Sequence, residues 1–309
     1  MVIAGSGIAG IAAADAALEK GLKTLVLDTS RDVGYTLAGA MFISESTFRN
    51  FFSDFSNHLN SQYSSVVWET NTISSEETIR LKYPIYSMDR EKLVRSRAVN
   101  SISKGATLKI MSKILSVKRN GDIMDLECSV EGKKETIQTT YLALGHYNMG
   151  DPLLKHSKTC NKKSFYGNYS RGASMKTGKT PMLRITGDLN SFRVMATWGN
   201  MWEKISYKYH DRDDHTAITS SRMVGNAHDC LPETEKNIVV LGKLLGTKNL
   251  FGLDAGNSHQ ISKDTVTDLI EKGWDEAMEK LKLNWSKYMN SNHGYDDLTR
   301  FLYHIPIGR

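Results

Sequence analysis

The feature that most constrains this chain is the glycine-rich stretch GSGIAG at residues 5–10. It follows a short apolar segment, residues 1–4, and precedes a helix-compatible run over residues 11–20. A second apolar segment, residues 22–27, ends at Asp28. A strand, a tight turn, a helix and a second strand within about thirty residues match the length of one βαβ unit. The sequence therefore predicts a parallel sheet that begins with the first residues.

Glycines at these positions suit a dinucleotide pyrophosphate. Gly5 is expected to form the turn, Gly7 to let the backbone approach the phosphates, and Gly10 to pack the helix closely against the turn. The helix N-terminus favours negative charge. Asp28 ends the second strand, where a carboxylate can accept hydrogen bonds from both ribose hydroxyls. Neighbouring residues complete the expected set of contacts: Ser6, Ala9 and Thr29.

Composition narrows the class of protein. A chain of 309 residues with 40% hydrophobic residues can bury a full core in two lobes. No apolar run approaches the ~20 residues of a transmembrane segment, and the start lacks a secretory signal, so we expect a cytoplasmic protein. Three cysteines without a CxxC pair predict no metal centre. The 40 basic residues are mixed with 34 acidic ones, so we expect no nucleic-acid partner.

After residue 105 the hydrophobic period changes to two. Residues 107–118, 124–130 and 136–144 are predicted to be three strands joined by short glycine-containing turns, which is a β-meander. The last of these strands ends at Gly145.

Three stretches have helical spacing. Residues 89–104 are predicted as a helix with Asp89 as N-cap and Gly105 after its end. Residues 261–288 show apolar positions at steps of three and four. A third stretch places aromatic and aliphatic residues on one helical face, which we interpret as core packing: Phe48, Phe51, Phe52, Phe55 and Leu59.

The expected fold class is α/β, a Rossmann-like cofactor domain with a β-meander plus a mostly antiparallel substrate lobe. Residues 1–150 would form the first part of the cofactor domain. Residues 151–235, which are richer in Tyr, Trp, Ser and Thr, would form the antiparallel lobe. Residues 236–309 would return to the cofactor domain, because the apolar run 238–241 is typical of a buried strand and a long helix follows.

Several of these features together resemble the two-dinucleotide-type flavoproteins, especially the geranylgeranyl reductase and aromatic hydroxylase superfamily. They are the N-terminal GSGIAG unit, Asp28, the stretch YPIYSMDREKL at residues 83–93 before a helix, and a meander that closes in Ala-Leu-Gly at 143–145. The resemblance covers about residues 1–150 and implies an FAD cofactor. In that family an arginine opens a helix beside the flavin, so Arg90 is carried over as a cofactor contact. Ile114 and Gly145 are expected to be cofactor contacts as well.

The family also has a late Gly-Asp motif, a glycine-rich turn and a helix that receive the FAD ribityl chain and pyrophosphate. Residues 241–243, Leu-Gly-Lys, and residues 252–257 are similar to a degraded version of it. Lys243 stands where the family has its aspartate, and its ammonium could contact a phosphate or the anionic N1 region of reduced flavin. The resemblance therefore implies four late cofactor contacts: Gly242, Lys243, Gly256 and Asn257.

The function we expect is an FAD-dependent oxidoreductase that transfers hydride to, or activates oxygen for, an unidentified small-molecule substrate. No second GxGxxG follows the first, so transiently bound NAD(P)H or a protein donor would supply electrons. An NAD-dependent dehydrogenase is one alternative, although the meander argues against its six-stranded parallel domain. A non-catalytic nucleotide-binding flavoprotein relative is another, suggested by Lys243. No residue is assigned a catalytic role, because no acid or base has a supporting partner in the sequence.

Overall fold

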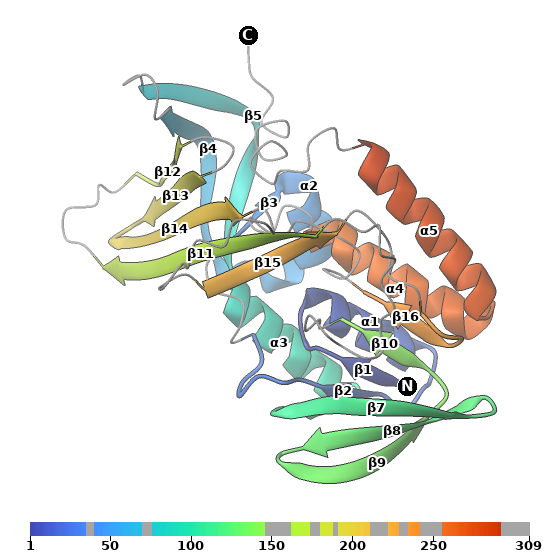
Figure 1. Ribbon diagram of the computed structural model, residues 1–309. Coiled ribbons are helices and arrows are strands. Elements are labelled where there is room, and N and C mark those ends of the chain that lie inside the picture. The colour runs from blue at the N-terminus through green and yellow to red at the C-terminus, as the bar shows by residue number, and fades with distance from the viewer. Residues whose placement is uncertain are drawn as a thin grey trace.

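The computed structural model describes residues 1–34, 40–69, 76–145, 162–173, 180–187, 191–210, 222–228, 234–241 and 255–291. Within these residues three sheets and a set of helices make up an α/β fold (Figure 1). A parallel sheet and a meander lie at one end of the molecule, and a larger mixed sheet lies at the other.

The parallel sheet has the strand order β16-β10-β1-β2-β6, and every neighbouring pair in it is parallel. Its strands are β1 (Val2–Ala4), β2 (Leu25–Leu27), β6 (Thr107–Lys109), β10 (Leu142–Leu144) and β16 (Ile238–Val240). Helix α1 (Ile8–Glu19) connects β1 to β2. The predicted βαβ unit is therefore present, and a strand from the 236–241 region joins the same sheet.

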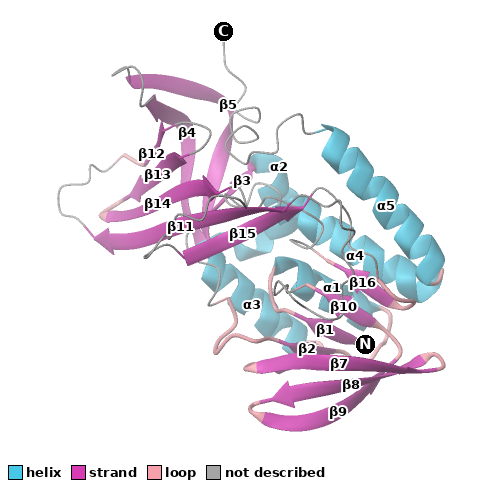
Figure 2. Cartoon of the chain, in the orientation of Figure 1, coloured by secondary structure: helices cyan, strands magenta, loops and turns pink. Residues whose placement is uncertain are grey.

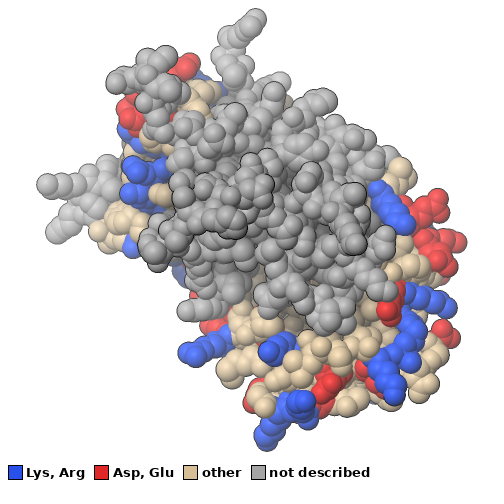
Figure 3. Space-filling model, in the orientation of Figure 1, with Lys and Arg blue, Asp and Glu red and all other residues tan. Residues whose placement is uncertain are grey.

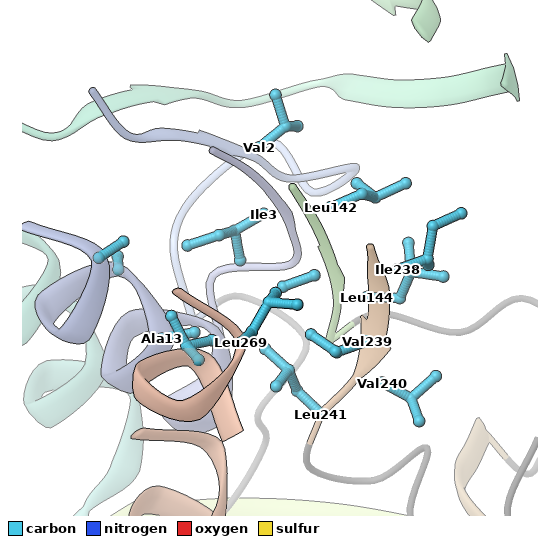
Figure 4. Packing of buried hydrophobic residues seen from close by; sticks show 14 of the residues in the cluster. Val2, Ile3, Ala13, Leu142, Leu144, Ile238, Val239, Val240, Leu241 and Leu269 are labelled. Carbon is cyan, nitrogen blue, oxygen red and sulfur yellow. The ribbon is translucent and has the colours of Figure 1, made fainter. Parts of the chain in front are cut away.

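Apolar side chains from this sheet and its helices form the main core (Figure 4). Ile3 and Val239 are fully buried. Helix α1 is rich in alanine on the sheet side, which lets it lie close to the strands. Helix α4 (Ala255–Glu271) packs against α1, and α5 (Trp274–Ser291) is tied to β16 by a hydrogen bond from Trp274 Nε1 to the Ile238 carbonyl oxygen (3.0 Å).

The meander consists of β7 (Ser112–Asn120), β8 (Ile123–Val130) and β9 (Lys133–Thr139). The predicted meander is confirmed, but its outer boundaries were wrong. The first predicted strand breaks at Met111, whose φ of 47° lies in the left-handed region and turns the chain. Residues before it become β6, and residues after β9 become β10, so both short pieces pair in the parallel sheet instead.

The larger sheet has the order β15-β11-β14-β13-β12-β4-β5-β3. Its strands are β3 (Ala40–Ser44), β4 (Leu59–Glu69), β5 (Glu76–Asp89), β11 (Lys162–Ala173), β12 (Met182–Gly187), β13 (Ser191–Trp198), β14 (Met201–His210) and β15 (Arg222–His228). Neighbours are antiparallel except β12 and β4. The mostly antiparallel sheet is thus present, and three of its strands come from residues 40–89, where the sequence analysis predicted no strands.

Helix α3 (Arg90–Ser103) forms as predicted. The Asp89 carboxylate accepts a hydrogen bond from Lys92 N (3.1 Å), and Gly105 ends the helix with φ of 108°. Val94, Ala98 and Ile102 are spaced four residues apart, yet Ile102 is 47% exposed. The buried face of the helix keeps Val94 and Ala98 and also includes Leu93, Arg97 and Ser101.

The aromatic stretch after β3 is not one helix. It divides into α2 (Glu45–Thr47), a π-helical turn η1 (Phe48–Phe52) and a 3₁₀ turn η2 (Ser53–His58), and Leu59 already belongs to β4. Phe55 has non-helical dihedral angles that interrupt the run. The core-packing interpretation is confirmed, since Phe52 is fully buried and Phe48 stacks on Tyr86 with ring centroids 4.6 Å apart.

The C-terminal helical stretch is also divided. Gly273 has φ of 96°, which a right-handed helix cannot continue and which residues with a side chain rarely adopt, so α4 and α5 are separate helices (Figure 2).

Among the described helices, none is both long and apolar enough to cross a bilayer. On the face seen in Figure 3, Lys and Arg side chains lie beside Asp and Glu side chains along the lower and right-hand rim.

Candidate cofactor site

The site lies at the carboxyl edge of the parallel sheet. Ala4, Leu144 and Val240 are aligned in register, so three strands end side by side there. The glycine-rich turn follows the first of these strands, and Gly145 follows the second. Open α/β sheets bind their ligands at this edge.

The turn after β1 needs glycine for its backbone. Gly5 has φ of 102°, a conformation that side chains rarely allow, and its N–H donates to the Leu27 carbonyl oxygen (2.7 Å). That bond holds the turn against the end of β2. The sequence motif therefore has a local structural cause at its first position.

Gly10 and Gly145 are required by close packing. A Cβ on Gly10 would lie 1.9 Å from the carbonyl oxygen of Gly5, and one on Gly145 would lie 3.2 Å from that of Ala4. Gly145 also donates its N–H to the Ala4 carbonyl oxygen (2.7 Å). The first turn of α1 and the end of β10 are thereby packed directly on the backbone of the glycine-rich turn.

Gly7 has a different environment. It is the N-cap of α1, and a Cβ added to it would meet no atom of the described residues within 4 Å. The first helical hydrogen bond runs from Ile11 N to the Gly7 carbonyl oxygen (2.9 Å), so the first-turn N–H groups, including that of Ala9, have no partner in the helix. Open space thus lies beside a helix N-terminus that favours an anion.

Asp28 is fixed beside this turn by hydrogen bonds. Its Oδ2 accepts from Ser6 N (2.7 Å) and Ser6 Oγ (2.5 Å), and its Oδ1 accepts from Ser30 N (2.8 Å). Burial alone would raise the pKa of Asp28, but the hydrogen bonds from Ser6 and Ser30 outweigh it and hold the pKa below its ordinary value. The carboxylate is therefore ionised at neutral pH. No sequence periodicity signals the contact with Ser6.

The other predicted contacts occupy several elements. Arg90 is the first residue of α3 and is buried, Thr29 is exposed after β2, and Ile114 is half-buried in β7. Gly256 and Asn257 lie in the first turn of α4, not in a turn that precedes it. Gly242 and Lys243 lie outside the described residues, as do residues 252–254 of the predicted late turn.

A buried polar network that was not predicted from the sequence joins α3 to α1 and α4. Arg97 on α3 lies 2.7 Å from His259 Nε2 on α4 and 3.4 Å from Asp15 Oδ2 on α1. Its guanidinium also lies over the rings of Phe52 and Phe55. The network joins three helices. Its one signal in the sequence is an arginine on the same helical face as apolar residues.

The network fixes the proton of His259. An arginine only donates hydrogen bonds, so His259 Nε2 accepts and its proton lies on Nδ1. Burial, and then the positive charges of Arg97 and Lys263, lower the pKa of His259 to about 3 from 6.5. The imidazole is therefore neutral in the folded protein at neutral pH.

This depressed pKa predicts a pH dependence of stability. Above pH 6.5 His259 is neutral in the folded and in the unfolded protein, and as the pH falls toward 3 only the unfolded chain binds the proton. The free energy of unfolding should therefore fall by up to about 1.4 kcal/mol per pH unit in this window. Urea denaturation at several pH values should show a shallower acid loss in His259→Gln than in the wild type.

The matched control is His58→Gln. It replaces a half-buried imidazole that is hydrogen-bonded to Ser96 Oγ (2.7 Å) and leaves His259 in place, so the acid loss that His259 causes should persist in this variant. Parallel acid profiles for wild type and His259→Gln would contradict a neutral His259 in the fold.

Comparisons with known proteins match the fold over nearly the whole chain. No protein-family model matches this sequence, and no curated protein matches it either. A solved structure of a geranylgeranyl bacteriochlorophyll reductase-like protein from Thermoplasma acidophilum is similar with a TM-score of 0.68 and 12% identity, over 94% of this chain and 82% of that one.

Two further solved structures show the same likeness. The myxobacterial chondrochloren halogenase CndH, a variant of FAD-dependent halogenases, matches with a TM-score of 0.65 and 9% identity over 100% of this chain and 82% of that one. The p-nitrophenol 4-monooxygenase of Pseudomonas putida matches with a TM-score of 0.62 and 11% identity, over 91% of this chain and 83% of that one. This chain therefore has the fold of the FAD-dependent hydroxylases, which these reductase-like, halogenase and monooxygenase structures share.

Proposed function

We propose that this protein is an FAD-dependent oxidoreductase that acts on a small organic molecule. One observation carries the proposal: the space beside Gly7 holds no atom of the described residues, it adjoins the N-terminus of α1, and the ionised carboxylate of Asp28 is hydrogen-bonded to the neighbouring Ser6. A pyrophosphate needs the first two features, and an adenosine ribose needs the third.

The residues present fit this cofactor. The first-turn N–H groups of α1 would bind the pyrophosphate, and Asp28 would accept hydrogen bonds from the ribose. Arg90, Ile114, Gly145 and the first turn of α4, with Gly256 and Asn257, would contribute further contacts. FAD, when bound, would supply hydride transfer or oxygen activation. The protein would orient the cofactor and exclude water.

The remaining parts of the proposal concern organisation and partners. Residues 1–150 and 236–309 would form the cofactor domain, and residues 151–235 would provide the substrate lobe, whose sheet also takes in β3, β4 and β5 from residues 40–89. Reducing equivalents would come from NAD(P)H that binds transiently or from a protein donor. The solved structures that share the fold include enzymes of reductase-like, halogenase and monooxygenase type, which supports flavin chemistry without identifying the substrate.

Asp28→Ala tests the ribose contact. Losing a charge-assisted hydrogen bond of about 1.5–3 kcal/mol should weaken FAD binding roughly ten- to a hundredfold. The dissociation constant is measured by fluorescence titration of the apoprotein, together with its free energy of unfolding. Asp32→Ala is the matched control, because Asp32 is a nearby surface carboxylate that pairs with Arg95. Equal FAD affinity in the two variants would refute the ribose contact.

One alternative keeps the nucleotide site but not the chemistry. Lys243 stands where the similar family has an aspartate, so a non-catalytic FAD-binding protein is the second candidate. The mass and absorbance of the ligand released on denaturation separate FAD from NAD. Failure of the FAD-loaded protein to be reduced by NAD(P)H or by a chemical donor, with recovery in Lys243→Asp, would favour this second candidate.

A further inference from the structure

An arginine in the larger sheet reaches the start of α3. Arg171 on β11 lies 3.4 Å from Asp89 Oδ2 through Nη1, and 3.6 Å from Glu203 Oε1 through Nε. Its guanidinium carbon lies 5.8 Å from the ring centroid of Trp198. The side chain is therefore held by carboxylates from β5 and β14 and by an aromatic ring from β13.

The contact with Asp89 joins strands that are far apart in the sheet. β11 is second in the strand order and β5 is seventh, so five steps of about 4.8 Å, or about 24 Å, would separate them in a flat sheet. Figure 1 shows β4 and β5 standing upright while β11, β14 and β15 run across the view. The sheet is strongly twisted, which brings Arg171 and Asp89 together although their strands are far apart in the strand order.

Asp89 has a second role at the same point. Its Oδ1 caps α3 by accepting from Lys92 N (3.1 Å), while its Oδ2 faces Arg171. The next residue is Arg90, which is 6% exposed and is a proposed cofactor contact. A displacement of Asp89 would therefore move the start of α3 and Arg90 with it.

The charges make this contact costly to lose. The side chains of Asp89 and Glu203 are 9% and 4% exposed, and both face Arg171. Lys92 Nζ also lies 3.6 Å from Asp89 Oδ2, but its side chain is 65% exposed, whereas that of Arg171 is 35% exposed. Loss of the less exposed of these two cations weakens the compensation of a buried carboxylate, so the groups around it rearrange. Removing Arg171 should thus disturb the cap of α3 as well as the sheet.

We propose that Arg171 is a positioning residue that couples the eight-stranded sheet to the cofactor site, because it holds the N-cap of α3 and thereby orients Arg90. The proposal rests on the proposed FAD site. If it holds, a change in the eight-stranded sheet would alter the position of Arg90 and with it the environment of the flavin.

The chain offers a closely matched control. Arg184 on β12 also bridges two carboxylates, Glu69 (3.5 Å) and Glu76 (3.3 Å). The strand register places Arg171 on the same face as Glu203 and Leu183, so Arg184, the next residue after Leu183, lies on the opposite face. Each substitution to methionine removes one charge and two ion pairs from the same sheet.

The experiment compares Arg171→Met, Arg171→Lys and Arg184→Met with the wild type. The FAD dissociation constant, the visible spectrum of bound flavin and amide hydrogen exchange in peptides covering α3 are measured. Arg171→Met should weaken FAD binding at least about fivefold relative to Arg184→Met, shift the flavin bands and speed exchange in the first turns of α3. Arg171→Lys should recover part of each effect, and it serves if the methionine variant fails to fold.

The possible outcomes separate this proposal from the function it rests on. FAD binding by the wild type, with Arg171→Met or the folded Arg171→Lys matching Arg184→Met in affinity, spectrum and exchange, would overturn the role of Arg171 alone. Absence of FAD binding by the wild type would overturn the proposed function, and the cofactor coupling with it.

Discussion

Gly10→Ala is expected to destabilise the fold severely. The added Cβ would lie 1.9 Å from the Gly5 carbonyl oxygen and 3.6 Å from Ile3 Cγ2. The oxygen belongs to the backbone of a turn that is itself hydrogen-bonded to Leu27, so it cannot move away as a flexible side chain would. Overpacking of this kind costs on the order of 3 kcal/mol, which exceeds the ~1 kcal/mol that alanine gains over glycine within a helix.

The measurement is the free energy of unfolding of the apoprotein by urea, followed by far-UV circular dichroism. Gly7→Ala is the control in the same motif, because among the described residues no atom lies within 4 Å of the added Cβ. It should change stability by less than about 1 kcal/mol. Gly10→Ala with wild-type stability would mean that α1 does not pack on the turn as described.

The parallel unit at the start of the chain could be predicted because its determinants are local. An apolar strand, a glycine turn, an alanine-rich helix and a second apolar strand follow one another, and few folds other than a βαβ unit accommodate that order. The meander could be predicted for the same reason, since apolar and polar residues alternate along its strands and its turns contain glycine. Both predictions depend on neighbours in the sequence.

The larger sheet could be predicted only in part. Its antiparallel character was expected from residues 151–235, but residues 40–89 contribute β3, β4 and β5. Phe48 to Leu59 have helical spacing, yet a π-helical turn and a 3₁₀ turn replace a regular helix where the aromatic rings pack against β5 and α3. Tertiary packing overrode the local pattern at these positions.

Single backbone angles explain the wrong boundaries. Met111 and Gly273 both have positive φ, and each divides what the hydrophobic pattern alone predicts as one element. A methionine carries no sequence signal for this conformation. Gly273 does carry one, since glycine commonly follows the end of a helix, but the apolar positions on both sides of it continue at helical spacing.

The site shows the same division between local and distant determinants. The roles of Gly5 and Gly10 follow from a motif read along the chain, and the structure gives each a steric reason. Ser6 follows β1 and Asp28 follows β2, so the hydrogen bond between them connects the ends of two strands. The contact between Arg97 and His259 connects two helices from opposite halves of the chain. Such tertiary contacts leave no periodic pattern.

Gly7→Val is expected to abolish FAD binding while the fold is retained. Gly7 has φ of −69° and ψ of 180°, an extended conformation that valine adopts without strain, and within the part of the chain that the structure describes no atom lies within 4 Å of the Cβ position. The proposed pyrophosphate would occupy that space. A branched side chain there should raise the FAD dissociation constant by at least about a hundredfold, which corresponds to ~2.7 kcal/mol.

The test is a graded series of Gly7→Ala and Gly7→Val, with FAD affinity from fluorescence titration and stability from urea denaturation. Affinity should fall from glycine to alanine to valine, because the steric overlap with a phosphate grows with each methyl group. Stability should fall by no more than about 1 kcal/mol, which is the typical cost of placing an aliphatic residue at an N-cap. A valine variant that binds FAD as tightly as the wild type would show that no phosphate lies against this turn, and the N-terminal motif would then be a purely structural one.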